Sequence, residues 1–135
     1  MLESDGSVLL SLSGIATIAN LGIHNLAVFV FDNGMYSGTR ISEPTATGGK
    51  TDLAQVARAA GIERSVCASD LESFKEHAAT ALAGKDLSFI VCKVQESLIH
   101  REIPRPDTDL VENKYRFVRY LQKTEGKVPP FIGRG

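Results

Sequence analysis

Hydrophobic and polar positions along this chain alternate between strand and helix patterns. Residues 25–31 form a nearly continuous β-branched and aromatic run, which is typical of a strand buried on both faces of a sheet. Residues 87–94 predict a strand buried at least in its first half, and residues 64–68 predict a short strand. Longer segments with several apolar or small positions per turn predict helices, and these cover 7–21, 51–60, 69–84 and 109–126. The order helix, strand, helix, strand, helix, strand, helix implies an α/β fold with a parallel sheet and helices on both faces.

Turn and capping residues mark where the predicted helices begin and end. Gly22 and Gly61 stand directly after the first two, as expected for residues that stop a helix. Thr51 or Asp52 is suited to cap the second helix, and Ser69 followed by Glu72 forms a capping-box pattern before the third. Between them, residues 32–50 form a long segment without periodicity, and in so small a domain such a loop is more often functional than idle.

The start of the chain departs from the usual α/β order. A polar turn at residues 3–6 comes directly before the first helix, with only Met1 and Leu2 where a strand should stand. We therefore expect a sheet that is incomplete at its N-terminal side, with the equivalent strand missing or supplied by another chain. The expected organisation is one partial α/β domain over residues 1–126 and a loose tail over 127–135.

Composition and charge exclude several classes of protein. The 135 residues include 15 Lys and Arg against 16 Asp and Glu, so the net charge of −1 gives no electrostatic case for binding nucleic acid. No apolar run reaches the roughly 18 residues that span a bilayer, and the first residues lack the pattern of a signal peptide. Cys67 and Cys92 are too few for a disulfide framework, so we expect buried, reduced thiols in a cytoplasmic protein with no membrane partner.

Two acid–amide clusters lie where predicted strands should end. The first is Ser4-Asp5-Gly6-Ser7 and the second is Asp32-Asn33-Gly34. Ligands of open α/β sheets bind at the carboxyl ends of strands, where Asp5 and Asn33 could offer oxygen ligands to one hard cation. Gly6 and Ser7 would offer backbone N–H groups to an anion at a helix N-terminus. Asp-Gly and Asn-Gly are also common turn dipeptides, so two ordinary turns remain the alternative from these residues alone.

The spacing of the two clusters resembles a known motif. Asp5-Gly6, followed after 25 residues by Asp32-Asn33, is similar to the metal-binding motif of thiamine-diphosphate-dependent enzymes, which reads Gly-Asp-Gly, a spacer of similar length, and Asn-Asn. Ser4 replaces the first Gly, and Asp32 replaces the first Asn. The similarity continues through four short segments, residues 33–36, 44–47, 51–54 and 56–61. Arg105-Pro106 and Glu112-Asn113-Lys114, followed by Phe117, resemble the tail of the sulfopyruvate and phosphonopyruvate decarboxylases.

The resemblance implies a specific set of ligands for thiamine diphosphate and Mg²⁺. Asp5, the side-chain oxygen of Asn33 and the carbonyl of Met35 would bind the metal. The residues that would contact the cofactor are Gly6, Ser7, Asn33, Gly34, Met35 and Tyr36. No residue of this chain is implied as catalytic, because in the family a Glu of a second, pyrimidine-binding domain activates the cofactor. The chain matches only the diphosphate-binding domain, so the resemblance implies a partner subunit or domain and a small 2-oxoacid substrate.

Two further expectations accompany this interpretation. The chain should be a homo-oligomer, because an incomplete sheet and a first helix without a fully polar face leave apolar surface to cover. Alone it should be inactive as a decarboxylase. The alternatives are a non-catalytic scaffold or interaction subunit with a vestigial metal site, and part of an acetolactate synthase-like carboligase.

His24, His77 and His100 show no metal-binding spacing, and Gly48-Gly49-Lys50-Thr51 lacks the upstream Gly of a P-loop, since position 44 is Pro.

Overall fold

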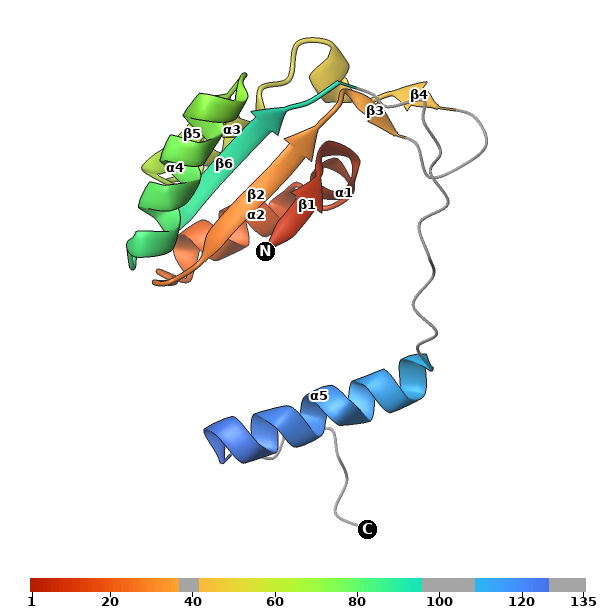
Figure 1. The fold of residues 1–135 in the computed structure, drawn as a ribbon. Helices are drawn as coiled ribbons and strands as arrows, with labels where there is room; N and C mark the ends of the chain where they lie inside the picture. Colours follow the sequence, from red (N-terminus) through yellow and green to blue (C-terminus); the bar gives the residue numbers. More distant parts are fainter. Residues whose placement is uncertain (37–41, 96–108, 127–135) are drawn as a thin grey trace. The chain divides into compact units, whose positions relative to one another are not determined.

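The computed structural model describes residues 1–36, 42–95 and 109–126, which belong to two units, Met1–Leu98 and Ile99–Gly135. The first unit contains a four-stranded sheet in the order β1-β2-β6-β5 (Figure 1). Its strands are β1 (Leu2–Ser4), β2 (Ala27–Asp32), β5 (Arg64–Ala68) and β6 (Ser88–Lys93). Every neighbouring pair in this sheet is parallel, so the predicted fold class is confirmed.

Helices cover both faces of the sheet. They are α1 (Asp5–Leu10), α2 (Ser13–Asn20), α3 (Leu53–Ala59) and α4 (Leu71–Ala83). Because side chains alternate along a strand, Val30 of β2 packs into a core cluster with residues of α2 and α3, whereas its neighbour Phe29 packs with Phe74 and Ala81 of α4. Figure 1 shows α4 on one side of the sheet and α2 and α3 on the other.

The second unit contains one described helix, α5 (Leu110–Glu125), close to the predicted 109–126. The Asp109 side chain caps it by accepting from the backbone N–H of Val111 at 2.8 Å, and Gly126 ends it in the left-handed region with φ 64°. The predicted tail at 127–135 and most of the loop before α5 lie outside the described residues. None of the helices within the described ranges is both long and apolar enough to cross a membrane.

The prediction that no strand precedes the first helix was wrong. Leu2–Ser4 form β1, which pairs with β2 in parallel, from Leu2 opposite Phe29 to Ser4 opposite Phe31. The backbone N–H of Phe29 also donates to the carbonyl of Met1 at 3.0 Å. A strand of three residues is too short to show a periodic pattern, and hydrogen bonds to β2, which are invisible in the sequence, are what stabilise it.

Two segments have more structure than predicted. The single helix expected over 7–21 is two helices, because Ser11 leaves the helical region (φ −138°, ψ 58°) between α1 and α2. Serine is a poor interior helix residue since its hydroxyl competes for backbone hydrogen bonds. The segment 32–50, predicted to be irregular, contains the antiparallel pair β3 (Met35–Tyr36) and β4 (Glu43–Pro44) and the short helix η1 (Ala46–Gly48).

Two smaller predictions also need correction. Cys92 is buried as expected, but Cys67 is exposed. Asp70, not Ser69, caps α4, by accepting from the backbone N–H of Ser73 at 2.9 Å. Of the two residues proposed to cap α3, the structure selects Asp52.

Asp52 supplies a test of the capping assignment. Its carboxylate accepts from the backbone N–H groups of Ala54 at 2.9 Å and Gln55 at 3.0 Å. The hydrogen bond from the Gln55 backbone is the main cause that lowers the pKa of Asp52 below its ordinary value, against the opposing effect of burial. Asp52→Ala should lower the free energy of unfolding at pH 7 by about 0.5–2 kcal/mol, the usual effect of losing an N-cap.

The loss of stability in Asp52→Ala should depend on pH because the pKa of Asp52 is lowered in the folded protein. The folded-state pKa lies below the unfolded one, so the stabilisation is fully present above the unfolded-state pKa and disappears as the pH falls through the folded-state value. The free energies of unfolding of the wild type and of Asp52→Ala, measured by urea denaturation, should therefore become equal in strongly acidic solution. Asp86→Ala, which removes an exposed ion pair with Arg64, is the control and should change stability by less than about 1 kcal/mol. A difference for Asp52→Ala that persists at low pH would contradict the assignment.

Candidate functional site

The carboxyl ends of three parallel strands meet at one edge of the sheet. Ser4 of β1 is opposite Phe31 of β2, so the next residues, Asp5 and Asp32, stand at neighbouring strand ends. Asp32 is in turn opposite Lys93, the last residue of β6. Residues in register on neighbouring strands point to the same face, which places the side chains of Asp32 and Lys93 together.

Asp5 is a buried carboxylate with one oxygen unpaired. The residue is 0% exposed. Its Oδ2 accepts from the Thr45 hydroxyl at 2.6 Å and lies 3.0 Å from the Thr47 hydroxyl. Its Oδ1 is buried and has no hydrogen-bond partner in the described ranges. A buried, unpaired carboxylate oxygen is unfavourable, and a bound cation is one of the few ways to compensate it.

Asp32, the second buried carboxylate, is fully paired. Its Oδ1 accepts from the Thr47 hydroxyl at 2.8 Å and from the backbone N–H of Gly34 at 3.0 Å. Its Oδ2 is 2.6 Å from Lys93 Nζ. Thr47 therefore connects the two carboxylates, one from the end of β2 and one from the start of α1.

The turn after β2 is fixed by its own side chains and by a close backbone approach. The side-chain oxygen of Asn33 accepts from the backbone N–H of Met35 at 3.0 Å. Gly34 has φ +68°, and a Cβ atom there would lie 3.1 Å from the Cα of Gly48. The Gly34 carbonyl accepts from the backbone N–H of Thr45 at 2.9 Å. Glycine at position 34 therefore lets residues 45–48 pack directly on the turn.

Tyr36 lies against the first turn of α1. A Cβ atom at Gly6 would come within 2.6 Å of the Tyr36 ring, so only glycine fits at position 6 with the ring in this place. The backbone N–H of Ser7 donates to the Ser4 hydroxyl at 3.2 Å, so this amide is already paired. A cavity of about 440 Å³ opens beside these groups, lined by Ser4, Ser7, Phe31, Asn33, Met35, Tyr36 and Val94.

The structure thus brings the predicted residues from the two clusters to one edge, and it adds three that the sequence analysis did not single out. Thr45, Thr47 and Lys93 pair with three of the four oxygens of the buried carboxylates, and Asp5 Oδ1 stays unpaired among the described residues. The hydroxyls of Thr45 and Thr47 lie within the segment 44–47, and Lys93 is a charge at the end of an otherwise apolar run. These positions in the sequence were the only signals that the three residues belong to the site. Their hydrogen-bond partners depend on the register of the sheet, which the sequence does not show.

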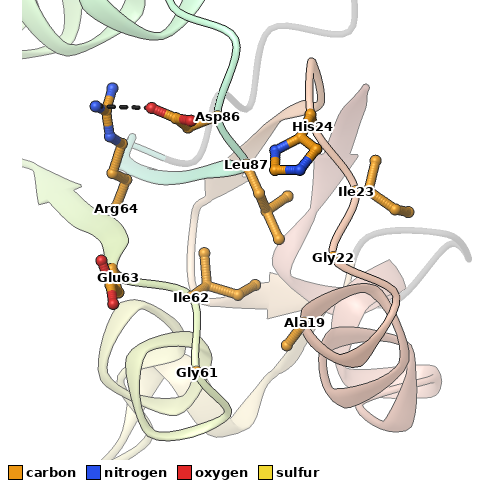
Figure 2. Close-up of a pocket in the computed structure, with 10 residues that line it drawn as sticks. All are labelled: Ala19, Gly22, Ile23, His24, Gly61, Ile62, Glu63, Arg64, Asp86 and Leu87. Carbon is orange, nitrogen blue, oxygen red and sulfur yellow. Dashed lines mark ion pairs between the residues drawn. The ribbon is translucent and has the colours of Figure 1, made fainter.

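A second cavity of about 350 Å³ lies at the opposite, amino-terminal edge of the sheet (Figure 2). It is lined by residues that precede the strands, among them His24, Glu63 and Leu87. Its most prominent charges, Arg64 and Asp86, are exposed and pair with each other at 2.8 Å. No unpaired buried group faces it among the residues described, so we place the chemistry at the carboxyl edge.

The thiols near that edge are not activated. Burial raises the pKa of the Cys92 thiol, and the loss of surrounding water, followed by the nearby charge of Asp52, raises the pKa of the Cys67 thiol although that residue is exposed at the surface. Both thiols therefore stay protonated at neutral pH and are poor nucleophiles. His24 is exposed at the amino edge and His77 lies on α4, whereas His100 is outside the described residues.

Comparison with known proteins identifies the family. Residues 2–92 match the thiamine pyrophosphate enzyme family at its C-terminal TPP binding domain. The chain belongs to this family. It is similar to the sulfopyruvate decarboxylase subunit beta of Methanocaldococcus jannaschii, with 28% identity over 127 residues, covering 92% of this chain and 64% of that protein. It is also 30% identical over 123 residues to the subunit of the same name from Methanococcus maripaludis, covering 90% of this chain and 63% of that protein.

The match encloses the site described above. Residues 2–92, which match the TPP-binding domain, include Asp5 and Asp32, the turn after β2, and Thr45 and Thr47. Lys93 follows directly after the matched residues. The chain spans less than two thirds of the length of these two relatives.

Proposed function

We propose that this chain holds the diphosphate of thiamine diphosphate and its Mg²⁺ as one part of a 2-oxoacid decarboxylase. Membership of the TPP-binding family supports the cofactor. The names of the two relatives, both sulfopyruvate decarboxylase subunits, support decarboxylation of a sulfopyruvate-like acid, and the resemblance of the tail adds phosphonopyruvate-like acids. The observation that carries the proposal is the unpaired Oδ1 of Asp5, which is buried at the edge of the sheet where ligands of this fold bind.

The residues present suit a magnesium ion. Asp5 would supply a carboxylate oxygen, Asn33 its side-chain oxygen through a second lone pair, and Met35 its carbonyl. Mg²⁺ binds oxygen ligands, and it is usually held by one or two carboxylates together with phosphate oxygens and water. Within the described part of the chain, no group of three or more His, Cys, Asp or Glu side chains could hold a metal. The site would therefore depend on amide, carbonyl and diphosphate oxygens in addition to Asp5.

The cofactor would be bound by the residues that line the cavity and by the turn beside it. Gly6 and Ser7 would contact the diphosphate, and Asn33 to Tyr36 would line the cofactor. When bound, thiamine diphosphate supplies the nucleophilic carbon and the electron sink for loss of CO₂. In this chain, Asp32 and Lys93 are paired with each other, so neither is available as an acid or base. The family resemblance implies that the activating Glu comes from a pyrimidine-binding partner.

Association of this chain with itself and with that partner is part of the proposal. The relatives are named as beta subunits, which supports a second kind of subunit. Leu2 on the edge strand is 71% exposed and Leu10 at the end of α1 is 76% exposed, while Leu9 is half-buried against the core. Apolar side chains beside an edge strand favour a homo-oligomer.

Calorimetric titration with thiamine diphosphate, with and without Mg²⁺, tests the proposal. We expect binding that requires Mg²⁺ and that is tighter when a pyrimidine-binding subunit from the same organism is added. Light scattering on the same samples should show an oligomer. Absence of binding with and without that subunit would contradict the proposal and favour the scaffold alternative. A ketol in place of an aldehyde as the product of a 2-oxoacid would favour the carboligase.

A further inference from the structure

We infer that Lys93 is a positioning residue of this site, which neutralises Asp32 and thereby holds the turn that carries Asn33 and Met35. The part that concerns the metal rests on the proposed function. The part that concerns the turn does not, because it depends only on contacts within the chain.

The first step is the charge that Lys93 meets. Asp32 is 2% exposed, and a carboxylate so buried is stable only when it is paired and hydrogen-bonded. Lys93 Nζ lies 2.6 Å from Asp32 Oδ2, and it also approaches the carbonyl of Thr47 at 3.4 Å. The Lys93 side chain is 43% exposed, so it reaches from solvent to the buried carboxylate.

The second step is what Asp32 does with its other oxygen. Oδ1 accepts from the backbone N–H of Gly34 and from the Thr47 hydroxyl. The hydrogen bond from the Gly34 backbone N–H to Asp32 Oδ1 closes a turn that has Asn33 at its centre. An Asp32 side chain that turned away to reach water would lose this bond, and Asn33 and Met35 would lose their fixed positions. Lys93 thus acts on the turn through Asp32.

The third step is a count of protons and charges. Thr45 and Thr47 have one hydroxyl proton each. Thr45 can donate to Asp5 Oδ2 and Thr47 to Asp32 Oδ1, and no donor among the described residues reaches Asp5 Oδ1. Because Lys93 pairs with Asp32, Asp5 has no cationic side chain paired with it among the residues described. The pairing therefore leaves Asp5 as the carboxylate that can take a metal ion.

The same contacts explain why this chain can carry Asp where the family motif has Asn. The additional negative charge of Asp32 is matched by Lys93 on the neighbouring strand. The Asp32–Lys93 pair therefore has a net charge of zero, the same as an Asn at position 32 beside an uncharged residue at position 93. The two changes should therefore compensate one another: Asp32→Asn together with Lys93→Met should bind Mg²⁺ better than either single variant.

Amide NMR without cofactor tests the structural part. The variants are Lys93→Met, Lys93→Arg and, as the matched control, Lys75→Met, which breaks an exposed pair with Glu72 on α4. Lys93→Met should move the amide resonances of Gly34 and Met35 far more than Lys75→Met does, and Lys93→Arg should largely restore them. If the Gly34 amide is unmoved in Lys93→Met, the inference is overturned whatever the chain binds.

Titration of Mg²⁺ with thiamine diphosphate present tests the part that concerns the metal. Loss of a group that orients a ligand typically weakens metal affinity about 10–100-fold, and we expect this for Lys93→Met with recovery in the double variant. Equal weakening in the single and double variants would overturn the charge compensation. A wild-type chain that binds no Mg²⁺, together with a shifted Gly34 amide, would refute the proposed function while leaving the structural role of Lys93 supported.

Discussion

Asp5→Asn should abolish the Mg²⁺ dependence of thiamine diphosphate binding without destabilising the apo protein. The variant removes the carboxylate whose Oδ1 has no partner among the described residues, and with it the proposed protein anion at the metal. A buried polar atom without a partner typically costs about 1–3 kcal/mol. The neutral amide removes the negative charge but still places a polar atom at the unpaired position, so the free energy of unfolding of the apo chain should stay level with that of the wild type. Loss of a metal ligand should weaken Mg²⁺ binding more than the roughly 10–100-fold expected when only an orienting group is lost.

The combination of lost binding and retained stability is what makes this variant informative. Residues at binding sites are often kept at the expense of stability, whereas residues that only support the fold are not. Thermal unfolding with and without Mg²⁺ and cofactor measures both effects in one series. Asp86→Asn, which neutralises an exposed carboxylate in a surface ion pair, is the control and should keep the wild-type response to the metal. Unchanged Mg²⁺ affinity in Asp5→Asn would show that Asp5 is not a ligand, and a large fall in apo stability would show that the site is structural.

The chain by itself should show no decarboxylase activity, whereas the mixture with a pyrimidine-binding subunit should. Acid–base catalysis by a positioned side chain typically contributes about 10²–10⁴-fold, and the charged groups described at this edge are already committed to one another or to the proposed metal. The measurement is release of CO₂ from sulfopyruvate by the purified chain, by the partner and by both together.

Controls separate a missing partner from a damaged chain. Addition of Lys75→Met in place of wild type should leave the activity of the mixture unchanged, because Lys75 pairs with Glu72 on the surface of α4. Addition of Asp5→Asn should give no activity in the mixture. Turnover by the isolated wild-type chain at the rate of the mixture would refute the requirement for a partner.

Much of the fold could be predicted from the sequence because it depends on local patterns. The strands β2 and β6 are largely apolar runs that need burial on both faces, and helices such as α4 and α5 begin at residues whose side chains pair with free backbone N–H groups. The spacing between Asp5 and Asn33 also lies in the sequence, since one helical segment and one strand must fit between two ends of neighbouring parallel strands. The family follows from these residues, and the comparison confirms it.

Other features were decided only by the tertiary structure. β1 exists because three residues meet the edge of β2, and no pattern within Leu2–Ser4 could show that. The hydroxyls of Thr45 and Thr47 contact Asp5, which lies 40 and 42 positions earlier in the chain. The Thr47 hydroxyl also contacts Asp32, 15 positions earlier, and Lys93 contacts Asp32 across 61 positions. Such pairings depend on strand register and on the close packing of Gly34 against Gly48. The sequence therefore determined which residues stand at the strand ends, whereas the fold decided which carboxylate is paired and which is left with a free oxygen, because hydrogen-bond partners are set by neighbours in space.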